Sequence, residues 1–258
     1  MLLSTRFVEQ VWGCDTLPAP FTAPEKMRVG EIVFDPPPSL PDLLVKYLFT
    51  AETQPVQCQP SAQQAAAAGH GDSGSEKCWI VISAQPGALI GIGFNQPFTA
   101  DVLPKAARDG TIAELMRWFE VQTGDVFTIP AGTVHAIGPG CVVVEMLRNT
   151  GAQREILLEP RVTAANGNPY DTALRKSLPA SGSAMLVDGP DFRVDLVAGV
   201  QDEAQLYSYA QPLLVLPLSG EVLIAGAALA SPGECAIAPD LASVTFAPDG
   251  KALVMAPL

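Results

Sequence analysis

One histidine of this chain is well placed to do chemistry. His135 follows the turn sequence at residues 130–132 and begins a short apolar run. Together with the turn at 124–125, this pattern predicts a strand, a turn and a second strand over residues 124–138. At the start of the second strand the imidazole can point inward, where it binds a divalent metal or hydrogen-bonds as a neutral core histidine. The pattern alone leaves both interpretations open.

The elements that must position His135 are short apolar runs separated by turns. The 24 prolines and 22 glycines favour a turn-rich β architecture over a helical bundle. The sequence predicts strands over residues 28–34, 43–49, 55–60, 79–83, 88–94, 141–147, 213–218, 222–224, 235–237, 244–246 and 253–256. The turn at 85–87 predicts that 79–83 and 88–94 are the two arms of one hairpin.

Helices are expected in three places. Apolar residues recur at helical spacing over residues 100–119, and Gly110 breaks that region into two helices. The alanine-rich run 61–68 predicts a short helix, followed by a flexible loop over 69–75 that contains His70. A further short helix is expected over 170–176.

Composition excludes several classes of function. The net charge of −12 disfavours nucleic acid and anionic lipid as partners, and no basic patch offsets it. No apolar run has the length of a membrane span or a secretory signal, so the cytoplasm is the expected location. The five cysteines form no C-x-x-C pair, which predicts reduced thiols rather than disulfides or a thiolate zinc site. Nothing in the sequence specifies an oligomeric state.

The stretch around His135 resembles the G-D-x-x-x-x-P-A-G-T-V-H-A-I-G segment of type I mannose-6-phosphate isomerases. Further matching pieces occur in the same order over residues 5–160: Val11-Trp12-Gly13, Gly30-Glu31-Ile32, Leu43-Leu44-Val45-Lys46, Val56-Gln57, Trp79 with its apolar strand, and Glu145. The resemblance implies a zinc-dependent cupin enzyme that interconverts mannose 6-phosphate and fructose 6-phosphate. In such a reaction the metal organises the sugar oxygens while a proton moves between C1 and C2 through an enediol.

The resemblance also implies four zinc ligands, and two of them are exchanged here. Gln57 and His135 are retained, whereas Gln59 replaces a histidine and Lys77 replaces a glutamate. A carboxamide is a weak zinc donor, and an ammonium repels the ion. Zinc is therefore expected to bind weakly or not at all. Glu76 is a candidate replacement ligand if a β-bulge turns it inward, and His70 is a second candidate if its loop folds over the mouth of the cavity.

The remaining site residues follow from the same resemblance. Lys77 is a candidate catalytic group, and its amine is also expected near the vacated metal position, donating to Gln57, Gln59 and His135. Arg154 is a candidate for the family's catalytic arginine, and Arg161 is an alternative that would contact the sugar phosphate. Lys46 and Glu145 are candidate substrate-binding residues. The plain alternative for these charges is a position at the barrel rim or on the surface.

The predicted fold is mostly β, a bicupin of two jelly-roll barrels with a few short helices. Residues 1–162 would form the cupin domain with the cavity, 163–190 a linker, and 191–258 a second, smaller barrel. The interval from Gly124 to Pro130 recurs from Gly233 to Pro239, and Val244 takes the place of His135.

Three functional hypotheses remain open at this point. The favoured one is an isomerase-like protein with weak or lost catalysis that can still bind a sugar phosphate. The second is an active zinc-dependent isomerase with a rearranged site made of His135, Gln57 and either Glu76 or His70. The third is a metal-free chemistry with Lys77 as base or Schiff-base amine.

Overall fold

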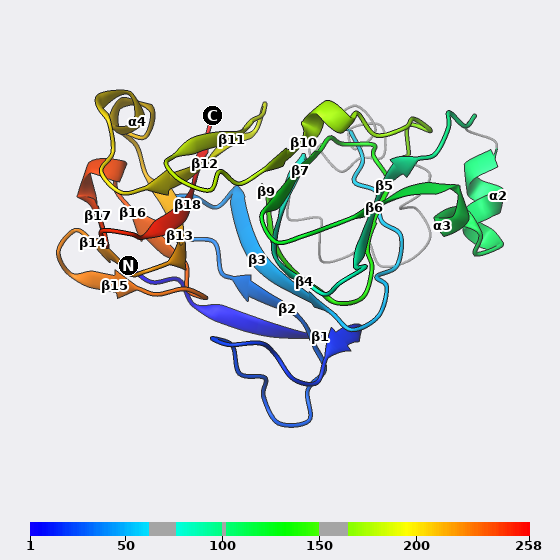
Figure 1. Ribbon diagram of the computed structural model, residues 1–258, viewed down its shortest axis with the longest axis horizontal. Coiled ribbons are helices and arrows are strands. Elements are labelled where there is room, and N and C mark those ends of the chain that lie inside the picture. The colour runs from blue at the N-terminus through cyan, green and yellow to red at the C-terminus, as the bar shows by residue number, and fades with distance from the viewer. Residues whose placement is uncertain (62–75, 100–101, 150–164) are drawn as a thin grey trace.

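The computed structural model describes residues 1–61, 76–99, 102–149 and 165–258. In these ranges the chain is mostly antiparallel strand, arranged as two units side by side, with the N-terminal unit in blue to green and the C-terminal unit in yellow to red (Figure 1). The expected helix at 61–68, apart from its first residue, lies outside the described residues. The loop with His70 and the arginines Arg154 and Arg161 also lie outside them.

The N-terminal unit is built on a seven-stranded sheet with the order β1-β2-β3-β9-β4-β7-β10. Its strands are β1 (Thr5–Cys14), β2 (Val29–Phe34), β3 (Leu43–Thr50), β4 (Lys77–Ala84), β7 (Asp125–Ile129), β9 (Cys141–Arg148) and β10 (Arg175–Ser177). The central strands β3, β9 and β4 are nearly continuous apolar runs, as expected for strands covered on both faces.

A smaller sheet faces one side of this large sheet. It has the order β6-β5-β8, formed by β5 (Leu89–Phe94), β6 (Met116–Glu120) and β8 (His135–Ile137). Side chains from both sheets, among them Trp79, Phe127 and Ile90, form the core between them. The helices α2 (Val102–Arg108) and α3 (Ile112–Leu115) pack against the small-sheet residues Phe94 and Ala136.

The C-terminal unit repeats this plan. A five-stranded sheet, β11-β12-β18-β13-β16, packs against a three-stranded sheet, β15-β14-β17, around its own apolar core. The elements are β11 (Ala184–Asp188), β12 (Phe192–Ala198), α4 (Glu203–Ser208), β13 (Leu213–Ser219), β14 (Val222–Ile224), β15 (Ala228–Ala230), β16 (Ala236–Ala238), the 3-10 turn η4 (Leu241–Ser243), β17 (Val244–Phe246) and β18 (Lys251–Pro257).

The two units are joined by the largest apolar core of the molecule. This core lies between the seven-stranded and the five-stranded sheets and includes Phe34, Tyr47, Ile80, Phe192 and Leu253. The large sheet is therefore covered on both faces, by the C-terminal unit on one side and by the small sheet on the other. The predicted mostly β, bicupin-type architecture is confirmed.

Several local predictions were wrong. Residues 116–119 form the strand β6 and not the end of a helix, because Trp118 pairs with Gly91 in the small sheet although the apolar spacing also fits a helix. The turn at 85–87 does not close a hairpin. The strands β4 and β5 on either side of it belong to different sheets, so the chain crosses from one sheet to the other at this turn.

The interval 163–190 contributes to both units. The 3-10 turn η3 (Thr172–Leu174) leads into β10, which pairs with β7 at the edge of the large sheet. Strand β11 then begins the five-stranded sheet. The segment 55–60, predicted as a strand, forms only an isolated bridge between Gln57 and His135. In the described parts of the chain, no helix is long and apolar enough to cross a membrane.

Gly93, in strand β5 beside the strand of His135, is a position that requires glycine. It has φ of +65°, its amide donates to the Val134 carbonyl, and an added Cβ would overlap the backbone of Tyr170. Gly182 has a similar φ of +76° but open space around it. Both Gly→Ala variants carry the left-handed cost of about 1–2 kcal/mol, whereas only Gly93→Ala adds overpacking of about 1–3 kcal/mol.

We therefore expect Gly93→Ala to lower the free energy of unfolding by clearly more than Gly182→Ala does. Urea denaturation of the two variants measures the difference. Equal losses would show that the approach of Tyr170 to Gly93 is not tight.

Candidate functional site

His135 lies on the inner face of the small sheet. It pairs with Ile92 in β5 on one side and with Gln57 on the other, where the two backbones exchange hydrogen bonds of 2.8 and 2.9 Å. Residues directly opposite in an antiparallel bridge project to the same face, so Gln57 also points into the unit. Gln59 follows two residues later, and its backbone carbonyl accepts a 2.7 Å hydrogen bond from the amide of Gly132, three residues before His135. The structure thus brings these three predicted residues together.

The hydrogen bond of His135 defines its tautomer. Nδ1 lies 2.8 Å from the Thr133 carbonyl oxygen, and a carbonyl only accepts, so Nδ1 carries the proton. In the neutral ring Nε2 then bears the lone pair. A backbone carbonyl that orients the imidazole in this way is typical of histidines that bind metal through the other nitrogen.

Lys77 faces His135 from the opposite side of the interior, because it belongs to the large sheet. Its side chain is 2% exposed, and its Nζ lies 2.8 Å from Oε2 of Glu145. Glu145 belongs to the neighbouring strand β9. The hydrogen bond that the structure shows for Lys77 is therefore to a carboxylate rather than to the glutamine amides expected from the sequence.

Glu145 collects three donors. In addition to Lys77, Lys46 on β3 approaches Oε1 at 2.9 Å, and the Trp79 indole nitrogen donates to Oε2 at 2.8 Å. Lys46 also reaches Glu31 on β2 at 3.1 Å. These charges alternate in sign across the four adjacent strands β2, β3, β9 and β4, so each buried charge has an opposite neighbour.

These contacts and burial shift the pKa values of Glu145, Lys77 and Lys46, and not all in the same direction. Burial alone would raise the pKa of Glu145, but Lys46 and Lys77 hold the pKa of that carboxyl well below its usual range. Burial lowers the pKa of Lys77, with Glu145 opposing this and Lys46 adding to it. Burial would also lower the pKa of Lys46, yet Glu145 and Glu31 outweigh it and raise the pKa. Because the pKa of Glu145 is so low, Glu145 is ionised, and the Lys77 amine donates its 2.8 Å hydrogen bond to a carboxylate.

Trp79 links the two sides of the site. Its ring packs edge-on against the His135 imidazole, with ring centroids 5.1 Å apart and an interplanar angle of 85°. The Lys77 amine lies 5.8 Å from the centroid of the same indole. The site is thus a compact group in which the Lys77–Glu145 pair contacts the Trp79 indole, and the indole contacts the His135 imidazole.

Glu76 lies away from this group. It precedes β4, contacts Gly189 in the C-terminal unit, and faces the side of the sheet on which Cys78 lies. Burial and the neighbouring Asp191 raise the pKa of Glu76 to about 6. This placement follows the alternation of side chains along the strand, and the bulge of β4 falls farther on, between Val81 and Ser83.

The residues present do not fit a zinc ion. The positions that the resemblance assigns to ligands offer one imidazole, two carboxamides and an ammonium, and the ammonium has no lone pair to donate. Among the residues that the structure describes, no group of three or more His, Cys, Asp or Glu side chains is arranged to hold a metal.

Sequence reasoning did not anticipate that Trp79 would act as a hydrogen-bond donor or that Glu31 would end the row of charges. A usable signal was present, since Lys46 and Glu145 each interrupt an otherwise apolar run and must be paired if buried. Arg154 and Arg161, which lie outside the described residues, keep their predicted roles as hypotheses.

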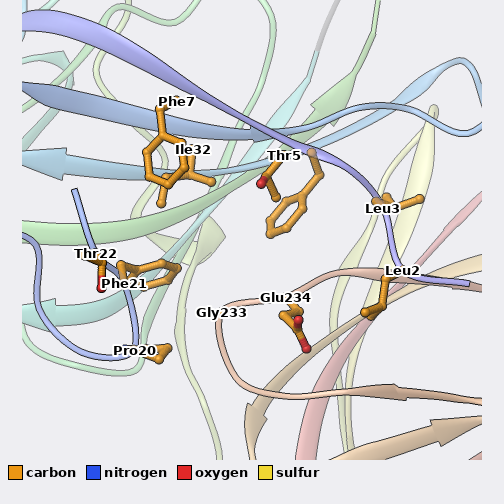
Figure 2. Close-up of a pocket in the computed structure, with 11 residues that line it drawn as sticks. Leu2, Leu3, Thr5, Phe7, Pro20, Phe21, Thr22, Ile32, Gly233 and Glu234 are labelled. Atoms are coloured by element: carbon orange, nitrogen blue, oxygen red, sulfur yellow. The ribbon is translucent and has the colours of Figure 1, made fainter. Parts of the chain in front are cut away.

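A separate hollow of about 350 Å³ lies at the start of β1 (Figure 2). It is lined by Leu2, Leu3, Thr5, Phe7, Pro20, Phe21, Thr22, Ile32, Phe34, Gly233 and Glu234. Glu234 is the charged member of this lining and accepts a hydrogen bond from the Ser231 amide. The lining is mainly apolar and contains none of the residues around His135.

Comparison with known proteins agrees with this fold. No model of a known protein family matches the chain. Mannose-6-phosphate isomerase ManA of Bacillus subtilis is 33% identical over 136 residues, which cover 53% of this chain and 42% of ManA. The mannose-6-phosphate isomerase of Streptococcus mutans is 29% identical over 197 residues, covering 69% of this chain and 61% of that enzyme. The matched regions thus span about half the length of these relatives.

Solved structures share the fold over nearly the whole chain. The mannose 6-phosphate isomerase of Bacillus subtilis superposes with a TM-score of 0.71 at 18% identity, covering 99% of this chain and 98% of that one. A variant of phosphomannose isomerase from Salmonella typhimurium gives 0.73 at 12% identity, covering 99% of both chains. The chain therefore has the β fold of the phosphomannose isomerases. Together with the sequence matches, this fold confirms the resemblance to the mannose-6-phosphate isomerases.

The ionisation of Glu145 leads to a prediction on acid stability. Because its folded pKa lies below the unfolded value of 4.5, its ion pairs stabilise the fold above about pH 4.5 and lose that effect as the pH falls. Glu145→Gln should therefore cost about 3–5 kcal/mol at pH 7, and this gap to the unmodified protein should narrow by about 1.4 kcal/mol per pH unit below about pH 4.5.

Urea denaturation at pH 7, 5, 4 and 3.5 measures this gap. Glu114→Gln, at an exposed carboxylate on α3, serves as the matched control and should show little change with pH. A gap for Glu145→Gln that stays constant down to pH 3.5 would contradict the assigned ion pairs.

Proposed function

We propose that the chain is a mannose-6-phosphate isomerase-like protein that binds a sugar phosphate without a catalytic zinc and has weak or lost isomerase activity. The observation that carries this proposal is the buried ion pair between Lys77 and Glu145. It places a positive charge where the resemblance expects a metal-binding carboxylate. A divalent cation in the same pocket would be repelled by that charge and would find few lone pairs.

The binding part of the proposal rests on polar groups that remain in the pocket. The Gln59 side-chain oxygen is buried and accepts no hydrogen bond from any residue that the structure describes, so it can accept one from a sugar hydroxyl. Lys46 is the more exposed of the two site lysines, at 14%, and provides a cation toward solvent. Relatives named as mannose-6-phosphate isomerases point to a hexose phosphate as the ligand class.

A direct test compares metal content and turnover. The protein is purified without chelator beside ManA of Bacillus subtilis, zinc is measured by mass spectrometry, and both are assayed for conversion of mannose 6-phosphate to fructose 6-phosphate. We expect well under one zinc per chain and turnover far below that of ManA, because the donor set lacks a carboxylate and one imidazole. Stoichiometric zinc with comparable turnover would instead support an active enzyme with a rearranged site.

Restoring the expected donors gives a second prediction. The double variant Gln59→His with Lys77→Glu supplies an imidazole and a carboxylate beside Gln57 and His135, which is a four-ligand set that zinc accepts. We expect this variant to bind Zn²⁺ or Co²⁺ in calorimetry with at least tenfold higher affinity than the unmodified protein. Gln59→His alone is the control and should gain much less, since the ammonium remains. If the double variant binds no more tightly than the control, Lys77 is not the group that excludes the metal.

A further inference from the structure

The row of charges on the inner face of the large sheet ends at Lys77. Glu31, Lys46, Glu145 and Lys77 come from four neighbouring strands, and consecutive members are 3.1, 2.9 and 2.8 Å apart. Exposure falls along the row, from 16% at Glu31 to 2% at Lys77. The row therefore begins at a partly solvated carboxylate and ends at a fully buried amine.

Glu145 occupies the critical place in this row, because both of its oxygens are engaged. Oε1 accepts from Lys46, and Oε2 accepts from both Lys77 and the Trp79 indole. Two donors on a single oxygen fix the rotation of the carboxylate, and the carboxylate in turn fixes the indole. The indole then packs edge-on against His135. Contacts therefore run continuously from Lys77 to the imidazole.

We propose that the Lys77 ammonium is the resident cation of this pocket. It acts as a positioning residue that holds the Glu145 carboxylate and, through it, keeps the Trp79 indole against His135. This inference rests on the proposed function, since it requires that no metal-bound carboxylate stands at this position. It assigns to Lys77 an organising role instead of leaving it as a residue that merely excludes zinc.

The physical reason is the cost of an uncompensated buried charge. Without the Lys77 ammonium, Lys46 would be the one cation left at Glu145 among the residues that the structure describes, and Lys46 is shared with Glu31. A buried carboxylate whose remaining cation is shared with a second carboxylate recruits water or moves toward that cation. Either response changes the hydrogen bond to the Trp79 indole, because that bond ends on the same oxygen that Lys77 contacts.

The Trp79 indole N–H resonance in a ¹H–¹⁵N NMR spectrum reports this directly. The chain contains three tryptophans, so three indole signals are expected, and Trp79→Phe assigns the one of interest. Lys77→Met keeps most of the side-chain volume and removes the charge. We expect the Trp79 signal to shift upfield in this variant while the other two stay in place, and the melting temperature to fall by about 10 °C.

Lys176→Met is the matched control, because this exposed lysine makes one bond to a neutral acceptor, the Leu186 carbonyl. It should leave the Trp79 signal and the melting temperature nearly unchanged. The double variant Lys77→Met with Glu145→Gln removes both charges of the pair and leaves Lys46 with Glu31. Its loss in melting temperature should be smaller than the sum of the two single losses.

The outcomes separate the role of Lys77 from the proposed function. An unmoved Trp79 signal and melting temperature in Lys77→Met would overturn the role of Lys77 as resident cation. If Lys77→Met does not fold but the double variant does, the role of Lys77 is supported. If neither variant folds, the loss is explained by packing, and the role of Lys77 as resident cation is overturned. Stoichiometric zinc in the unmodified protein would instead overturn the proposed function.

Discussion

The site depends on one buried carboxylate. Glu145 is almost completely removed from water, and such a charge is tolerated only when cations and hydrogen-bond donors surround it. Lys46, Lys77 and the Trp79 indole meet that need from the two strands that flank β9. The order of the strands therefore matters as much as the identity of the residues, because both lysines reach Glu145 from strands that adjoin β9.

The stacking of sheets keeps this arrangement dry and rigid. The large sheet is covered on its outer face by the C-terminal unit, through the apolar core that includes Phe34 and Phe192, and on its inner face by the small sheet. At low solvent exposure the attraction between ammonium and carboxylate is screened little. The same burial lowers the pKa of Lys77, so the ion pair is maintained by Glu145 against the cost of desolvation.

The positions of most strands were predictable from the sequence, but which strands pair with one another, and in which register, was not. Apolar runs located most strands, including β3 and β13, and the turn sequences placed His135 at the start of its strand. The region 116–119 was misassigned because its apolar spacing fits both a helix and a half-buried strand. For the site, turn chemistry pointed to His135, and the family resemblance pointed to Gln57. The partner of Lys77 depends on the register of β4 against β9, a non-local property that spacing along the chain does not contain.

Lys77 stands where the resemblance implies a glutamate zinc ligand, and the net charges of the two arrangements can be compared. In the ligand set that the resemblance implies, a zinc ion of charge +2 and one glutamate together carry +1, and a protonated lysine also carries +1. At position 77 of this chain that charge of +1 is carried by Lys77, whose Nζ lies 2.8 Å from Oε2 of Glu145. An apolar residue at this position would have left the carboxylate with Lys46 as its cation within the described part of the chain. The electrostatic demand of Glu145 therefore favours an ammonium at position 77, which compensates the buried carboxylate from a neighbouring strand.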